Sequence, residues 1–266
     1  MATSSITANF YTDDPKAANA IVHALFTETS SPRRMPPRSR FEVKHTPAGD
    51  KAFFERLRSK LEREGLRRGM IEDLNVFPLM QYEAEIGEEN LAFFLSGFSC
   101  PKNLEVEDFL KSKARQSSRR SSSATYLVCS SKYRELLGYF TIMTKAYSVN
   151  GKLLNSANRR LIERFAEPDE NGYYHAAVYL IAQIGKNFAI PEERRIEGHD
   201  LLDLAINKFE TAKNILGGKL VMVEREADRP KLLEFYNDNG FKSWTTRRNA
   251  KDGMVYDQMF AVLGGK

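Results

Sequence analysis

The sequence has little cysteine, no long apolar run and no strong excess of charge of one sign. Its two cysteines, Cys100 and Cys129, are too few and too far apart for a disulfide framework or a zinc site, so we expect a cytoplasmic protein without a metal site. No apolar run is long enough to span a membrane, and the first residues lack the pattern of a signal peptide. Lysine and arginine (40) only slightly exceed aspartate and glutamate (35), which permits an anionic ligand or RNA without requiring either.

The composition is that of a globular protein with room for one large domain and an extension. Of the 266 residues, 42% are hydrophobic and 28% are charged. Residues 1–84 predict a helical N-terminal extension that contains a linker rich in proline and arginine at residues 30–40. Residues 85–266 predict the main domain.

The most informative stretch is residues 173–217. An apolar run at residues 176–185 predicts a strand that is buried on both faces. A charged loop with a proline follows, and residues 199–216 then show apolar side chains at helical spacing until a glycine pair ends the pattern. A strand, a turn with arginine and glycine, and a helix start can hold a pyrophosphate, because free N–H groups and the helix dipole face the anion. The alternative is ordinary packing of a helix on a sheet.

The rest of the main domain reads as alternating helices and strands. Asn103 predicts the cap of a helix with acidic residues in its first turn. Residues 91–95 predict a short buried element. The other predicted elements are a hairpin of strands at residues 124–129 and 136–143, a helix at 158–165, a strand at 219–223, a helix from 228–230, and a last antiparallel pair near 244–247 and 254–262.

This order of elements, together with local motifs, resembles the GNAT superfamily of N-acetyltransferases over residues 85–266. The most specific match is Phe235-Tyr236-x-x-x-Gly240-Phe241, and the hairpin that ends in Gly138-Tyr139-Phe140-Thr141 resembles the second and third strands of the family. The segment from Phe98 to Ala114 resembles a subgroup, the toxin acetyltransferases of toxin–antitoxin pairs. The resemblance implies an α+β or α/β GNAT fold, with a mixed and mostly antiparallel central sheet flanked by helices. It also implies acetyl-CoA as the co-substrate.

The phosphate-binding signature of the family, Gln/Arg-x-x-Gly-x-Gly/Ala, is imperfect in this chain. If Arg195 leads the signature, Gly198 is its middle glycine; if Gly198 is the last small residue, Arg194 or Arg195 serves as the basic group. We favour the second register. The asparagine that is often found in the last helix is also missing, and Arg229 stands near its place. The residues that the resemblance assigns to acetyl-CoA are Ile184, Gly185, Lys186, Arg194, Arg195, Gly198 and His199, the first three through main-chain groups.

Tyr236 is the candidate catalytic residue. The family places this tyrosine beside the coenzyme sulfur, where a nearby phenol with a reference pKa of about 10 can protonate a leaving thiolate whose reference pKa is about 8.5. The alternative is a core tyrosine packed beside Phe235.

The acceptor is predicted to be a primary amine. The strand predicted at residues 176–185 has no carboxylate between Ala176 and Lys186 that could act as a base. An α-amine is therefore favoured, because it needs a base less than a lysine side chain does. It is either the α-amine of an aminoacyl-tRNA or that of a small molecule. The basic run at residues 111–120 fits tRNA and fits a solvated surface equally well. A degenerate GNAT fold that only binds acyl-CoA or nucleic acid is the alternative function, and the resemblance leaves open a homodimer and an antitoxin partner.

Overall fold

The computed structural model describes residues 74–130, 132–250 and 253–264. The predicted N-terminal helices and the proline- and arginine-rich linker lie outside these residues. In the described part, the strands are β1 (Leu74–Pro78), β2 (Ala124–Ser130), β3 (Glu135–Asn150), β4 (Tyr173–Lys186), β5 (Leu220–Glu226), β6 (Lys242–Arg248) and β7 (Val255–Val262). The α-helices are α4 (Leu79–Ile86), α5 (Glu88–Ser96), α6 (Leu104–Asp108), α7 (Ala114–Arg119), α8 (Ser156–Ile162), α9 (Gly198–Leu216) and α10 (Pro230–Asp238).

The strands form one mixed sheet in the order β1-β2-β3-β4-β5-β7-β6. Only β4 and β5 run parallel, and every other neighbouring pair is antiparallel. Helix α9 is the crossover between these parallel strands, as a parallel connection requires. The predicted mixed and mostly antiparallel sheet, flanked by helices, is therefore confirmed.

The sheet begins upstream of the boundary expected between residues 84 and 85. Strand β1 pairs with β2 from Leu74, opposite Ser130, to Pro78, opposite Tyr126. Pro78 ends the strand and precedes α4 directly, because proline supplies no N–H for a ladder but suits a helix start. Residues 74–84 therefore form part of the sheet and of its helical cover.

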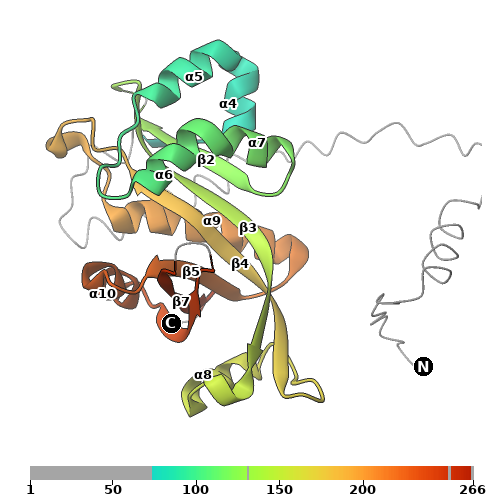
Figure 1. The fold of residues 1–266 in the computed structure, drawn as a ribbon. Helices are drawn as coiled ribbons and strands as arrows, with labels where there is room; N and C mark the ends of the chain where they lie inside the picture. Colours follow the sequence, from blue (N-terminus) through green and yellow to red (C-terminus); the bar gives the residue numbers. More distant parts are fainter. Residues whose placement is uncertain (1–73, 131, 251–252, 265–266) are drawn as a thin grey trace, which may run out of the picture. The chain divides into compact units, whose positions relative to one another are not determined.

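Two core layers enclose the sheet. Helices α9 and α10 cover one face, where Phe140 of β3 and Val221 of β5 pack against Leu201, Phe209 and Tyr236. On the other face, helices α4 to α7 lie over the β2–β3 end, and α8 lies at the outer end of the long β3–β4 hairpin (Figure 1). Strand β4 is the central strand of the sheet, and α9 connects it to its parallel neighbour β5.

The apolar run in β4 is not buried along its whole length. Both faces are buried from Val178 to Ile181, whereas buried and exposed side chains alternate from Tyr173 to Ala177. The outer half of β3 alternates in the same way. The strand predicted as buried on both faces is therefore so only from Val178 to Ile181, and residues 173–177 have one exposed face.

Local signals explain the start of α6 and the end of α9. The Asn103 side chain accepts hydrogen bonds from the N–H groups of Glu105 and Val106, which confirms the predicted cap. A π-helical turn (Phe109–Lys113) joins α6 to α7. Helix α9 ends at Gly217, whose φ of +73° few other residues adopt. The short buried element predicted at residues 91–95 is the buried side of helix α5.

None of the helices in the described ranges has the length and apolar character that a bilayer crossing requires.

Candidate active site

Strands β4 and β5 pair over three residues and then diverge. Residues 179–181 pair with residues 221–223. Beyond them β4 continues to Lys186 with β3 as its partner, and β5 continues to Glu226 with β7 as its partner. Ala182 is an extra residue at the shift of the β3–β4 register, and such a bulge bends a strand. Within the described residues, the β4 edge that faces β5 therefore has unpaired main-chain groups after Ile181.

The predicted residues Ile184, Gly185 and Lys186 lie on this diverging end of β4. Gly185 is buried, and a Cβ there would lie 2.5 Å from Cγ1 of Val106, so helix α6 packs directly against the backbone. The Nζ atom of Lys186 lies 3.3 Å from a carboxylate oxygen of Glu197. This ion pair links the end of β4 to the start of α9.

A buried asparagine fixes the chain immediately after β4. The Asn187 side chain is 3% exposed and accepts hydrogen bonds from the N–H groups of Ser99 and Ala189 at 3.0 Å each. It donates to the carbonyl oxygens of Leu136 at 2.8 Å and Gly97 at 3.4 Å. Buried polar groups that are fully paired in this way hold their surroundings in one arrangement. Asn187 therefore ties the end of β4 to β3 and to the link between α5 and α6.

The two predicted arginines are used within the fold. Arg194 donates two hydrogen bonds to the Glu135 carboxylate, at 3.0 and 2.7 Å. Arg195 donates to the carbonyl oxygens of Ile190 and Phe188, at 2.9 and 3.0 Å. The loop is further held by Ile190 and Ile196, whose side chains are buried. Both guanidinium groups therefore shape the loop before α9.

The start of α9 has no side-chain cap. The residue before the helix, Glu197, has an extended backbone, and its side chain makes no capping hydrogen bond. The first N–H groups of this helix are thus available, and they favour an anion. His199 Nε2 lies 3.2 Å from Asp200 Oδ1 without the alignment of a hydrogen bond. Burial raises the pKa of Asp200, although the charge of His199 opposes the shift.

Gly198 brings the start of α9 against α10. A Cβ at Gly198 would lie 3.2 Å from the ring of Phe235, closer than an ordinary van der Waals contact. Tyr236 follows Phe235, and their rings meet edge to face at 5.1 Å between centroids. A chain of contacts thus connects Lys186, Gly198 and Tyr236, which come from three separate elements.

Tyr236 is buried, and its hydroxyl has no hydrogen-bond partner among the described residues. Its side chain is 6% exposed and packs edge to face on Phe241, with the ring centroids 5.6 Å apart. Burial raises the pKa of Tyr236 to about 12. No described residue forms a hydrogen bond with its hydroxyl group, so the phenol keeps its proton at neutral pH and can offer it to a ligand.

The nearby carboxylates are engaged in ion pairs. Glu224 receives hydrogen bonds from Gln258 at 2.7 Å and from Arg247 at 3.0 Å. Burial alone would raise the pKa of Glu224, but these hydrogen bonds outweigh it and hold the pKa below its usual value. Glu226 pairs with Arg229. The described residues include no group of three or more histidine, cysteine, aspartate or glutamate side chains that could hold a metal ion.

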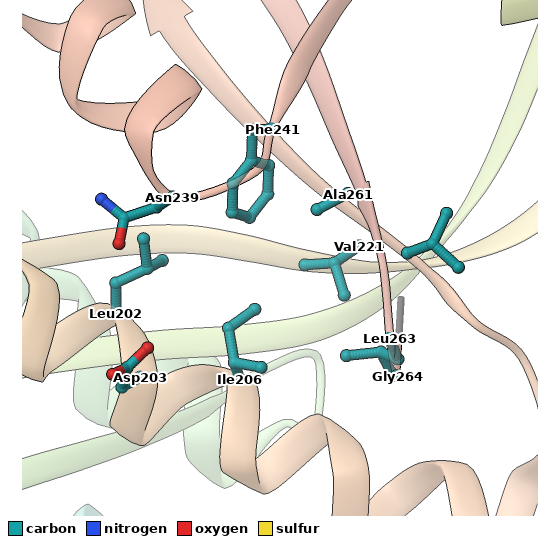
Figure 2. Close-up of a pocket in the computed structure, with 10 residues that line it drawn as sticks. Leu202, Asp203, Ile206, Val221, Asn239, Phe241, Ala261, Leu263 and Gly264 are labelled. Atoms are coloured by element: carbon teal, nitrogen blue, oxygen red, sulfur yellow. The ribbon is translucent and has the colours of Figure 1, made fainter. Parts of the chain in front are cut away.

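A cavity of about 180 Å³ lies beside this region, between α9, β5 and β7 and the link from α10 to β6 (Figure 2). Leu202, Ile206, Val221 and Phe241 are among the apolar residues that line it, and Asp203 and Asn239 add polar atoms. The residues predicted to bind the coenzyme do not line it. Tyr236 does not line it either, although Phe241, which packs on the Tyr236 ring, does.

The structure places the predicted residues on neighbouring elements but shows other roles for some of them. Ile184, Gly185, Lys186, Gly198 and His199 lie at the end of β4 and the start of α9, as expected. Arg194 and Arg195 are turned to protein partners. Asn187 is a residue that sequence reasoning missed, because a single polar residue after a strand is no signal of a buried hub.

Comparison with known proteins gave matches among solved structures alone. No protein-family model matches the chain, and neither does any curated protein. AtaT complexed with acetyl-methionyl-tRNAfMet is 18% identical, covering 69% of this chain and 94% of AtaT, with a TM-score of 0.47. A tyrosine-to-phenylalanine variant of KacT is 15% identical, covering 70% of this chain and 95% of KacT, with a TM-score of 0.48. A tyrosine-to-phenylalanine variant of the toxin AtaT is 16% identical, and the match covers 74% of this chain and 94% of AtaT, with a TM-score of 0.49. The chain is thus similar to AtaT and KacT, and because these scores lie below 0.5, its fold rests on its own strand order and register.

Proposed function

We propose that this protein is an acetyl-CoA-dependent N-acetyltransferase that acts on a primary amine. The observation on which the proposal rests is the divergence of β4 and β5 after residues 181 and 223. Beside it lie the uncapped start of α9 and the hydroxyl of Tyr236, to which no residue in the described ranges is hydrogen-bonded. An extended ligand with a polar amide arm can pair with an unpaired strand edge in the way that an added strand does. A phosphate group at its other end suits a helix N-terminus.

The residues present fit the coenzyme in most respects. In our proposal, main-chain groups of Ile184, Gly185 and Lys186 bind the pantetheine arm, and the first N–H groups of α9, at Gly198 and His199, face the pyrophosphate. The absence of a Cβ at Gly198 allows close approach of Phe235, and so of α10. Because Arg194 and Arg195 are already paired, their role in the proposal is to hold the loop in shape, with the helix start as the main phosphate-binding group.

In the proposed reaction, the neutral amine nitrogen attacks the thioester carbon and the carbonyl oxygen takes up the electron pair. When the carbonyl re-forms, the carbon–sulfur bond breaks and its electron pair goes to sulfur. Tyr236 donates the proton of its hydroxyl to that sulfur, and the proton lost by the nitrogen returns to the phenolate through water. The side chain is suited to this role because its hydroxyl is protonated, desolvated and not hydrogen-bonded to any described residue.

The acceptor is proposed to be an amine that deprotonates easily, with the α-amine of an aminoacyl-tRNA as one candidate and a small amine as the other. The support is that Glu224 and Glu226 are held in ion pairs, so neither carboxylate is free to act as a base. An α-amine, with a reference pKa of about 7.7–8.0, needs such a base far less than a lysine, at about 10.4.

The basic run at residues 111–120 gives limited support to tRNA. Lys111 pairs with Glu107, and Lys113 pairs with Asp108. Arg115 and Arg119 both pair with Glu83 and Glu88, which fastens α7 to α4 and α5. Much of the positive charge of this run is thus balanced by acidic neighbours.

If the acceptor is a tRNA, its affinity for the protein falls steeply with salt, with a slope of roughly −0.7 to −0.9 in log K per phosphate contact. We expect Lys111→Gln/Lys113→Gln to flatten that slope, because both ammonium groups are partly exposed. Filter binding at several salt concentrations measures it. Lys152→Gln, at the outer end of the β3–β4 hairpin, is the matched control and should leave the slope unchanged. A protein that acetylates small amines but binds no tRNA at low salt would exclude the tRNA acceptor.

The experiment that tests the enzyme class is a calorimetric titration of the full chain with acetyl-CoA, followed by measurement of the free thiol released when an amine is added. We expect one binding site per chain and release of the thiol only when the amine is present.

A further inference from the structure

A buried ion pair joins three strands next to the start of α10. A guanidinium nitrogen of Arg225, on β5, lies 2.9 Å from a carboxylate oxygen of Asp257, on β7. The same oxygen accepts a hydrogen bond of 2.6 Å from the hydroxyl of Ser243, on β6. The two charged side chains are 5% and 9% exposed. The pair is therefore removed from solvent, and neither member is placed to contact a ligand.

The other side of the Arg225 guanidinium holds the link between β5 and α10. Its Nη1 donates to the carbonyl oxygen of Glu226 at 2.9 Å and also faces those of Arg229 at 3.3 Å and Ala227 at 3.4 Å. These three carbonyl groups belong to the turn that leads into the helix. Arg225 thus fixes this turn from inside the protein, and Asp257 fixes Arg225.

Helix α10 depends on that turn for its position. The helix has 9 residues, and the residue before it, Arg229, makes no side-chain cap. Tyr236 is its one buried residue, about two turns after Arg229. A short helix with little burial has weak internal stability, so the direction of its first turn decides where its buried side chain lies.

Stability alone does not account for a buried ion pair at this place. Charged groups lose hydration when they are buried, and well-packed apolar residues of similar size are often as stable or more stable. What apolar residues cannot supply is the set of hydrogen bonds that draws three carbonyl groups together.

We propose that the Arg225–Asp257 pair is a positioning element for the catalytic tyrosine: it fixes the turn before α10 and so sets the Tyr236 hydroxyl at the reacting sulfur. The proposal rests on the function proposed above. Arg225 acts through Tyr236 and touches neither the acetyl donor nor the amine.

The test is a double-mutant cycle of Arg225→Lys and Tyr236→Phe in the full chain. A lysine keeps the charge but cannot bond to Asp257 and to the turn together, because it lacks the planar fork. Small displacements in an active site lower rates by up to ~10²-fold, so we expect Arg225→Lys to lower kcat by about 10- to 100-fold with little change in KM for acetyl-CoA. In the Tyr236→Phe background the same change should lower kcat no further, because no hydroxyl group is left to position.

Leu154→Ala is the control for a general loss of stability. Leu154 is buried in the core under α8, to which no residue of α10 belongs. The substitution should leave kcat near the wild-type value. Equal losses of kcat from Arg225→Lys in both backgrounds would overturn the proposal, and so would an unchanged kcat in the wild-type background. If Arg225→Lys does not fold, Asp257→Asn takes its place in the cycle.

A second measurement does not depend on catalysis. Without any ligand, amide hydrogen exchange in α10 should become faster in Arg225→Lys, while exchange in α9 stays as in the wild type. Unchanged exchange in α10 would overturn the positioning role even if the protein proved to bind no acetyl-CoA. Faster exchange in α10 together with absent acetyl-CoA binding would contradict the proposed function. The inference that the ion pair fixes the turn before α10 would still hold.

Discussion

Replacing Tyr236 with phenylalanine is expected to lower turnover by ~10²–10⁴-fold, the usual contribution of general acid catalysis. The substitution removes one hydroxyl group that no described residue uses, and it keeps the ring contacts with Phe235 and Phe241. Folding and affinity for acetyl-CoA should therefore stay close to those of the wild type. Steady-state kinetics, combined with calorimetric titration of acetyl-CoA, measures both quantities.

Two further measurements separate proton donation from packing. Because the pKa of Tyr236 is raised to about 12, the phenol stays protonated, so the wild-type rate should show no alkaline decline from this group at pH values well below 12. A thioester whose thiol is more acidic needs less help from an acid, so the turnover of the wild type and of Tyr236→Phe should differ less with such a donor.

A Tyr236→Phe enzyme as fast as the wild type would assign the proton to water or to another group. A collapse of acetyl-CoA affinity would instead show that the residue acts through packing.

Replacing Gly198 with glutamate is expected to weaken acetyl-CoA binding by at least tenfold relative to Gly198→Gln. Both side chains bring a Cβ to 3.2 Å from Phe235, so the steric effect is common to the two variants. Only glutamate places a negative charge at the helix start, where the proposal puts the pyrophosphate. A charge-assisted hydrogen bond contributes ~1.5–3 kcal/mol, and about 1.4 kcal/mol is tenfold in affinity.

Calorimetric titration of the two folded variants at low salt gives the comparison. Equal affinity in Gly198→Glu and Gly198→Gln would remove the pyrophosphate from the start of α9. If both variants bind as the wild type does, the contact of Gly198 with Phe235 has no bearing on the coenzyme.

The sequence predicted those parts of the fold that local patterns specify. The β2–β3 hairpin, helix α9 and its end at Gly217 follow from alternation, helical spacing and glycine, and the structure confirms them. It also predicted the cap at Asn103. Strand β1 was not predicted, because five residues beside a proline give too short a pattern to distinguish a strand.

The roles of single charged residues depended on contacts between distant parts of the chain. Arg194 meets Glu135, 59 positions away, and Arg119 meets Glu83, 36 positions away. Nothing near Arg194 in the sequence distinguishes an arginine that shapes a loop from one that binds a phosphate. The motif around Tyr236 predicted the helix, but the ion pair beside it joins Arg225 to Asp257 across 32 positions. Such pairings are set by the sheet order, which periodicity alone does not give.

The most direct test of the proposed function is the calorimetric titration of the full wild-type chain with acetyl-CoA, with Tyr236→Phe and Gly198→Glu titrated beside it. We predict one site per chain, with similar affinity in Tyr236→Phe and at least tenfold weaker binding in Gly198→Glu. Absence of binding to the folded wild-type chain would contradict the enzyme class. Binding that Gly198→Glu leaves unchanged would place the pyrophosphate elsewhere than at the start of α9.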